Sequence, residues 1–363
     1  MQTITNDNPR IKNRFWHNEV YQIAVRIRAD LKIFAVIALA TIVNLLILKL
    51  SGYKANISLF AYWGVIQTVL FVTIPIILLI YLGYLALQRE PRPLLRLLLK
   101  SKLIITHRHL LISGYVTLTA ISVFMSSFSA MKGAIPLIIP FRYDDVLIEL
   151  DRLLFFGHAP WEVVHAFFSS AYAIKFLNIN YNVWLVLIWA VSLFFLFSAQ
   201  TKLRTQYLVS WVLCWFLLGN LLALLLSSAG PVFLERLNPS NTIYSELTTL
   251  LAQHNDYLTR SGWGSLWALQ TQHDLWLAYA ENKEMLGSGI SAMPSMHNSF
   301  AVLMALSMYA VKRWLGILFI VHAIFIYIGS IALGWHYALD GIVSAPLTVL
   351  IWWLAGKYAR YKL

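Results

Sequence analysis

Long runs of apolar residues, separated by shorter polar segments, dominate the chain. Eight of these runs are close to or above the roughly 20 residues that an α-helix needs to cross the hydrocarbon core of a bilayer. We expect membrane helices at residues 31–50, 59–87, 110–130, 182–199, 207–229, 294–311, 314–333 and 337–356. The pattern therefore predicts an all-α fold, a polytopic membrane helix bundle with about eight transmembrane helices.

The amino-acid composition is that of a membrane protein. Of the 363 residues, 59% are hydrophobic and only 12% are charged, which excludes an ordinary soluble domain. The single cysteine, Cys214, lies inside an apolar run, so an internal disulfide and a cysteine-based metal cluster are excluded. The first 30 residues are polar and basic without a compact apolar core, so we expect no cleavable signal peptide.

Basic residues are concentrated in alternate connecting segments. If the amino terminus lies inside, most of the 28 Lys and Arg residues fall in inner segments, whereas most of the 16 acidic residues fall in outer ones. Loops rich in Lys and Arg stay in the cytoplasm, so both termini are predicted to be cytoplasmic. The net charge of +12 is then a topology signal, and we expect no nucleic-acid partner.

Two long segments, 131–181 and 230–293, lie on the predicted outer side. In the first, an apolar stripe at helical spacing predicts a short interfacial helix that Gly157 and Pro160 end. The stripe consists of Tyr143, Val146, Leu147, Leu150, Leu153 and Leu154. The aspartates beside it, Asp144, Asp145 and Asp151, are expected to be structural or capping groups. The second segment is long enough to contain interfacial helices of its own.

An aspartate at the start of the last apolar run is the first indication of chemistry. Asp340 follows His336 by four residues, so on a helix both side chains project from one face and the carboxylate can hold one imidazole N–H. That contact would fix the tautomer and leave the other ring nitrogen basic and free to attack. An ionisable residue in a membrane segment usually marks a functional site. His336 and Asp340 are therefore candidate catalytic residues.

A second polar cluster opens an earlier apolar run. Pro294 is expected to take the first helical position, so that Ser295 and His297 lie beside unpaired backbone N–H groups that favour a bound anion. The predicted topology brings both clusters to the outer membrane interface. The candidate polar groups at this interface are Ser295, His297, Ser330, His336, Asp340, Lys132 and Arg142.

These motifs resemble the signatures of the type 2 phosphatidic acid phosphatase superfamily. The family patterns P-S-G-H and S-R-x5-H-x3-D correspond to PSMH at 294–297 and to S-I-x5-H-x3-D from Ser330 to Asp340. Two positions depart from the family, because Ile331 replaces the arginine and Met296 replaces the usual glycine. The resemblance covers roughly residues 130–356.

The remaining family motif, K-x6-R-P, is not found in that form. Its nearest candidates are Lys132 and Arg142, which are ten positions apart. A lysine of this kind, the P-S-x-H motif and the run G-W-H-Y-A-x-D resemble the inositol phosphorylceramide synthase-like (inositolphosphotransferase-like) branch, which includes phosphotransferases and bacterial members. The resemblance implies a catalytic membrane domain with a six-helix phosphatase-like core at 110–363. Residues 1–109 would then form a basic segment and two extra transmembrane helices.

The resemblance also implies a reaction that needs no metal and no cofactor. His336 would form a phosphohistidine, Asp340 would orient it, and His297 would transfer protons. The expected phosphate-binding residues are Ser295, Lys132, Ser330 and Arg142. The implied substrate is a phospholipid or a polyprenyl or sphingolipid phosphate. Water as acceptor gives a phosphatase, and a hydroxyl acceptor gives a phosphotransferase.

The expected location is a bacterial inner membrane, with the active site on the extracytoplasmic side. A lipid or phosphate transporter or flippase without catalysis is the alternative function, and a purely structural role for the polar cluster is a third. The head group, the lipid tail, the role of residues 1–109 and the oligomeric state stay open. The histidines without a partner at suitable spacing are expected to lie outside the site: His254, His273 and His322.

Overall fold

The computed structural model describes residues 9–54, 58–283, 286–287 and 289–361, and these residues form helices and loops only, which confirms the predicted fold class. Among the described residues, seven helices are long and apolar enough to span a membrane. They are α2 (Leu31–Leu50), α3 (Ala61–Leu87), α5 (Arg108–Ile138), α8 (Ala171–Phe197), the helix from Lys202 to Leu225, α15 (Arg313–Ala332) and α16 (Ala338–Arg360). The eighth predicted helix, α14 (Met296–Val311), is present but has only 16 residues.

Three of these helices differ clearly from their predicted bounds. α5 ends at Ile138 instead of at residue 130, so Lys132 lies within it and not in the predicted outer segment. α8 begins at Ala171 instead of near residue 182, because Ser170 caps it and its polar first turns have partners. Asn178, for example, accepts the N–H of Ala268 at 3.1 Å. The helix predicted at 207–229 begins at Lys202 and is not α-helical throughout. It continues from α9 (Lys202–Leu213) through the π-helix η1 (Cys214–Leu222) into α10 (Ala223–Leu225).

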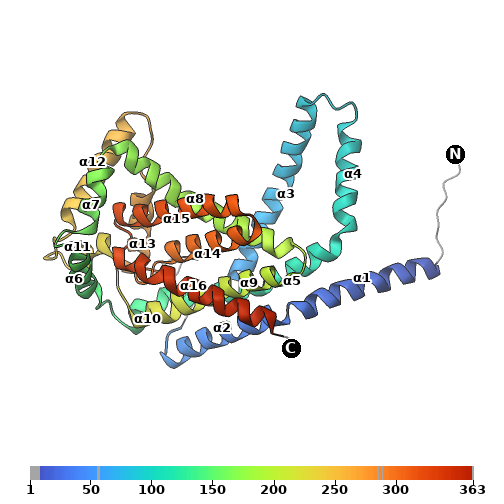
Figure 1. Cartoon of the computed structure of the whole chain (residues 1–363), viewed down its shortest axis with the longest axis horizontal. Coiled ribbons are helices and arrows are strands. Elements are labelled where there is room, and N and C mark those ends of the chain that lie inside the picture. Colours follow the sequence, from blue (N-terminus) through green and yellow to red (C-terminus); the bar gives the residue numbers. More distant parts are fainter. Residues whose placement is uncertain (1–8, 55–57, 284–285, 288, 362–363) are drawn as a thin grey trace.

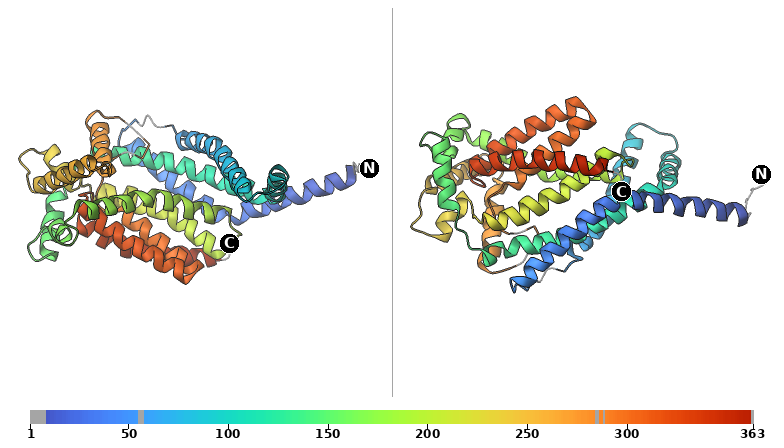
Figure 2. Two further views of the ribbon diagram at one scale, coloured as in Figure 1. Left: turned by 90° about the horizontal axis from the view of Figure 1, so that it is seen from above. Right: turned by 60° about the horizontal axis from the view of Figure 1, so that its bottom comes forward.

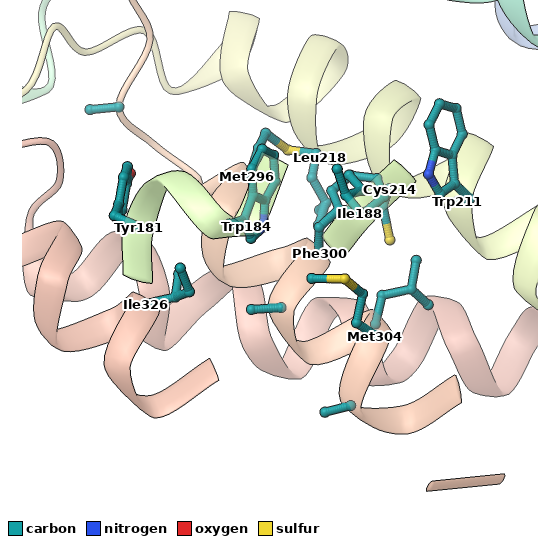
Figure 3. Packing of buried hydrophobic residues seen from close by; sticks show 14 of the residues in the cluster. Tyr181, Trp184, Ile188, Trp211, Cys214, Leu218, Met296, Phe300, Met304 and Ile326 are labelled. Atoms are coloured by element: carbon teal, nitrogen blue, oxygen red, sulfur yellow. The ribbon is translucent and has the colours of Figure 1, made fainter. Parts of the chain in front are cut away.

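The short helix α14 lies at the centre of the bundle. It packs against α8, α9, α15 and α16, and it buries Phe300 and Met304 completely in an apolar core with Trp211 of α9 (Figure 3). The Phe300 ring lies 5.8 Å from that of Trp211, centroid to centroid. A helix enclosed on these sides contacts neighbouring helices more than lipid, so it does not need the full length of a membrane-spanning segment.

The amino-terminal helices differ in how closely they join this bundle. α2 packs against α5 and α9, and a buried ion pair between Asp30 and Arg204 fixes its start. α2 therefore packs with the bundle although it precedes the predicted domain boundary at residue 110. In contrast, α3 packs against α5 only near its start, its remaining length and α4 (Pro93–Thr106) form a hairpin that stands away from the bundle, and α1 (Pro9–Ala29) extends beyond it (Figures 1 and 2).

The remaining helices gather at one end of the bundle, here called the site end. They are α6 (Asp144–Leu154), α7 (Pro160–Phe167), the 3₁₀ helix η2 (Pro231–Phe233), α11 (Leu234–Leu237), α12 (Ser245–Arg260) and α13 (Trp267–Ala280). Figure 1 shows the site end on the left, opposite both chain termini. The opposite end, here called the basic end, carries α4, the start of α9 and the Lys312–Arg313 turn.

α6 forms as the sequence predicts, but most of its apolar stripe faces away from the protein. The buried face of this helix contains Leu147 and Ile148 together with Asp144 and Asp151. The stripe residues that are exposed by 39 to 75% are Val146, Leu150, Leu153 and Leu154. This orientation suits a helix that lies at a membrane interface, with its apolar side chains toward lipid and its aspartates toward protein.

Candidate active site

The start of α16 holds the first histidine of the site. The Oδ2 atom of Asp340 lies 3.1 Å from Nδ1 of His336 and accepts the backbone N–H of Tyr337 at 3.1 Å. The predicted contact between the two side chains is therefore present. Asp340 is fully buried, and His336 is 7% exposed. When Nδ1 carries the ring proton and donates a hydrogen bond to Asp340, Nε2 of His336 has a free electron pair and can act as a nucleophile.

Two aspartates of α6 fix the position of this helix start. Asp151 accepts the backbone N–H groups of Ala338 and Leu339 at 2.7 and 2.9 Å, which are unpaired donors of the first turn of α16. Asp144 accepts the phenol O–H of Tyr337 at 2.8 Å and the backbone N–H of Gly230 at 2.9 Å. These contacts confirm the structural and capping roles predicted for both aspartates.

Asp151 gives the folded protein a pH dependence. Burial raises the pKa of this carboxyl from 3.8 to about 6, against the opposing effect of its two N–H donors. Between these values the folded protein holds a proton that the unfolded chain releases, so the carboxyl favours folding more at pH 5 than at pH 7. We expect Asp151→Asn to remove this contribution, about 1 kcal/mol between the two pH values.

The measurement is the thermal unfolding midpoint in detergent at both pH values. Asp145→Asn, which changes the exposed neighbour on the same helix, is the matched control and should keep the wild-type difference. The same difference between pH 5 and pH 7 in wild type and in Asp151→Asn would contradict this assignment.

The start of α14 differs from the prediction in one detail. Met296, and not Pro294, is the first helical residue, and Ser295 is the N-cap, with extended backbone angles and an Oγ that accepts the N–H of Asn298. The side-chain amide of Asn298 donates to Ser295 Oγ at 3.0 Å and to Ser330 Oγ at 3.4 Å. Both serine hydroxyls are completely buried. The structure thus brings Ser295 and Ser330 together through Asn298.

His297 lies between aromatic side chains and faces the other histidine. Its ring is 4.3 Å from the ring of Tyr181 and 4.3 Å from that of Trp184, which are one turn apart on α8. Figure 3 shows these two aromatic residues on the same stretch of α8, with Trp184 beside Met296. The centroids of the His297 and His336 rings are 6.0 Å apart. A phosphorus atom placed between the two rings would be within reach of both.

Lys132 is a cation whose charge acts on this pair. It lies on α5 near enough to His297 to affect the imidazole, and its Nζ donates no hydrogen bond to another described residue. Gly289 covers it, at a backbone φ of +113°, and a Cβ atom at that position would lie 2.9 Å from the Lys132 carbonyl oxygen. The loop can therefore approach the lysine only with glycine at this position.

Arg142 occupies a different environment. Its side chain is exposed, and its guanidinium lies 5.3 Å from the centroid of the neighbouring Tyr143 ring. Within the described part of the chain, no contact joins Arg142 to either histidine. The structure brings together six of the seven predicted site residues, and Arg142 stays at the edge of the site end.

The other histidines pack elsewhere. His322 is within 2.9 Å of the side-chain oxygen of Asn180, inside the bundle, and His273 is exposed on α13. His254 stacks on His165, whose Nε2 is 2.9 Å from the carbonyl oxygen of Ala332. Burial lowers the pKa of His165, which favours its neutral form. In the described residues no group of three or more His, Cys, Asp and Glu side chains has a geometry suited to a metal ion.

The comparison with protein families agrees with this geometry. The model of the PAP2 superfamily matches residues 145–354, which is more than half of the chain and includes both histidines and Asp340. The protein belongs to the PAP2 superfamily. No curated protein and no solved structure matches it. Lys132 and Arg142 precede the matched region.

The two departures from the superfamily motifs have structural consequences. Ile331 is 4% exposed and belongs to the apolar core, so no guanidinium enters the site from this position. Met296 is also buried and contacts the π-helix η1, where a Cβ atom added at Gly219 would lie 3.2 Å from its sulfur. The methionine thus ties the start of α14 to the neighbouring helix.

Sequence reasoning missed the residues that enclose the two histidines. Asn298 links the two serines, and Tyr181 and Trp184 hold the His297 ring, but nothing in their spacing separates them from ordinary residues of a membrane helix. The nearest available signal was the position of Asn298 directly after His297. Which aromatic residues face a histidine of another helix depends on helix packing, so the sequence alone does not reveal it.

Proposed function

We propose that this PAP2 superfamily protein is an integral-membrane lipid phosphatase or phosphotransferase that works through a phosphohistidine on His336. The observation that carries the proposal is the 6.0 Å separation of the His297 and His336 rings, with Asp340 within hydrogen-bond distance of His336. A nucleophile held by a carboxylate and a second imidazole on the far side of a shared space are the parts that phosphoryl transfer requires.

In the first step, Nε2 of His336 attacks phosphorus and the bond between phosphorus and the leaving oxygen breaks. His297 donates a proton to that oxygen, so the leaving group departs as a neutral alcohol. In the second step, water or another hydroxyl attacks the phosphohistidine while His297 takes up its proton. The N–P bond then breaks and free His336 is restored. Asp340 holds the imidazole in one tautomer and stabilises its positive charge in both steps.

Lys132 is the proposed cation for the phosphate oxygens. Its Nζ has no oxygen partner among the described residues and it lies close to His297, so its charge is available to an anion. Ser295 and Ser330 order the same site through Asn298. Ser295 Oγ only accepts from Asn298, so its O–H can still donate to a phosphate oxygen, whereas the O–H of Ser330 would first have to leave the carbonyl of Tyr327. Arg142 would have to leave the ring of Tyr143 to contribute.

The proposal favours the inositol phosphorylceramide synthase-like branch. Ile331 removes one phosphate contact that other superfamily members make. A phosphodiester with a bulky head group carries less negative charge than a phosphomonoester, so it needs fewer such contacts. The basic end is proposed to face the cytoplasm of a bacterial inner membrane, which places the site end on the extracytoplasmic side. Metal ions are not needed in this scheme.

The test uses purified full-length protein in detergent and in vesicles. The donors are phosphatidic acid, a polyprenyl phosphate, a sphingoid-base phosphate and an inositol phospholipid with ceramide as acceptor. We expect phosphate release from one donor, or a new phospholipid detected by mass spectrometry, and no loss of activity in EDTA. If no donor is consumed while the protein moves a labelled lipid across vesicles, the enzyme proposal is wrong and the transporter alternative is correct.

A further inference from the structure

We propose that a groove between α14, α15 and α16 holds the hydrocarbon chain of the lipid substrate, a proposal that rests on the function proposed above. The groove has a volume of about 710 Å³. It forms because α14 packs closely against both neighbours, while α15 and α16 make few contacts with each other. α14 is therefore the floor of the groove, and the two longer helices are its walls.

The chemistry of the lining selects an apolar occupant. The middle of the groove is formed by aliphatic side chains, among them Val302 and Leu306 from the floor and Ile324 and Ile342 from the walls. α15 and α16 are long and apolar enough to span a membrane, and α14 is a shorter apolar helix, so in the proposed topology the groove faces the hydrocarbon of the bilayer. A water-soluble ligand would gain no hydrogen bonds along this surface, whereas a hydrocarbon chain would make van der Waals contacts along its whole length.

One end of the groove adjoins the site. It is lined by Asn298, Tyr327 and Gly341. Asn298 directly follows His297, Gly341 directly follows Asp340, and the carbonyl of Tyr327 accepts the hydroxyl of Ser330 at 2.7 Å. A lipid whose phosphate lies between the two histidines would therefore have its chain at the mouth of this groove. This continuity distinguishes a substrate chain from an ordinary lipid that covers the outside of the bundle.

Because Gly341 has no side chain, Tyr327 and Asn298 can approach its backbone closely, and the mouth is narrow. A Cβ atom at Gly341 would lie 2.5 Å from the Tyr327 ring and 3.1 Å from Nδ2 of Asn298. The other end of the groove is lined by Tyr309 and Trp352. The helix from Asn298 to Tyr309 rises by about 16 Å, so the groove extends from the site about half-way through a bilayer.

The first experiment compares long and short chains. Ala323 and Ala345 are half-buried residues that line the two walls. We expect Ala323→Phe and Ala345→Phe to lower kcat/KM for dioleoyl phosphatidic acid at least tenfold, and to change it less than twofold for the water-soluble dihexanoyl form. Leu350→Phe is the matched control, since Leu350 is 48% exposed on a face of α16 that does not line the groove, and it should behave as wild type with both substrates.

The short-chain substrate also reports on folding, because a misfolded variant would lose activity toward both lipids. Size-exclusion chromatography shows whether each variant is folded. Equal losses with the two chain lengths in a folded variant, or no loss with either, would overturn the groove proposal and leave the proposed function intact. If the wild-type protein shows no activity with any donor tested, the proposed function is wrong, and this inference fails with it.

The second experiment identifies the occupant. Phosphatidic acid with a diazirine at the end of its acyl chain is photolysed with the full-length protein in phosphatidylcholine vesicles, and the labelled peptides are mapped by mass spectrometry. We expect labels at residues 302–310 and 320–324 that unlabelled phosphatidic acid suppresses at least fivefold and added phosphatidylcholine does not. Equal suppression by both lipids would show that the groove holds bulk membrane lipid and would overturn the proposal.

Discussion

His336→Ala is expected to lower the turnover of a lipid phosphate by about 10³-fold or more. In the proposed reaction this residue forms the covalent bond to phosphorus, and no neighbour can replace it. His297 is held between two rings with its own ring centroid 6.0 Å from that of His336. An attack by His297 would need a different substrate position and would leave the reaction without its proton donor.

The measurement is product formation by purified protein in detergent, together with size-exclusion chromatography to show that the variant is folded. His322→Ala is the matched control. It removes a mostly buried histidine from α15 that has its own partner, Asn180, and it should keep activity within a few-fold of wild type. If the His336 variant is about as active as the control, His336 is not the nucleophile.

Labelling of the intermediate separates a nucleophile from a residue that only binds substrate. With a ³²P-labelled donor, wild type should give an acid-labile, base-stable protein label, as expected of a phosphohistidine, and His336→Ala should give none. His297→Ala should keep the ability to become labelled with a donor whose leaving group needs no proton. A label that persists in the His336 variant would place the covalent step on another residue.

Asp340→Asn is expected to lower kcat by about 10²- to 10⁴-fold with a much smaller change in KM. The carboxylate lies 3.1 Å from Nδ1 of His336 and is the group that keeps the proton there. An asparagine amide that turns its NH₂ group toward Nδ1 would move the proton to Nε2. The nucleophilic nitrogen would then be blocked, and the imidazolium formed during the reaction would lose its counter-charge.

This variant also tests whether the carboxylate acts only by holding the helix. The same Oδ2 atom of Asp340 also accepts the backbone N–H of Tyr337, so an asparagine that turns its NH₂ group toward Nδ1 loses this one hydrogen bond, worth about 1 kcal/mol. The variant should therefore retain the thermal midpoint of wild type within a few degrees while activity is lost. Asp145→Asn, which removes one exposed carboxylate at the same end, is the control for net charge. A loss of stability that parallels the loss of activity would show a structural role instead.

Membrane helices and local contacts were predictable because they depend on near neighbours in sequence. Apolar length alone identified the spanning segments, and the four-residue spacing of His336 and Asp340 was enough to predict their contact. The serine cap of α14 and the early start of α8 were not predicted correctly. In both cases a polar side chain satisfied a backbone group, and apolar patterning does not record such contacts.

The interfacial helix α6 shows where patterning is insufficient. Its stripe correctly predicted a helix, but the sequence could not tell whether protein or lipid would cover that stripe. The structure turns four stripe residues outward and buries Asp144 and Asp151 instead. These aspartates are stable in that position because the start of α16 and the η2 loop supply N–H donors from distant parts of the chain.

The sequence by itself determined that the chain is a bundle of membrane helices and that His336 has Asp340 as its partner, since both depend on residues near one another in sequence. The two residues do not share one helix as predicted, because His336 precedes α16 and Asp340 lies in its first turn. Only the tertiary structure decided that Tyr181 and Trp184 enclose His297, that Arg142 stays at the edge of the site, and that α15 and α16 diverge to leave a groove. These features depend on how helices far apart in sequence pack together. Packing is set by the shapes of whole helix surfaces, and no single motif encodes it.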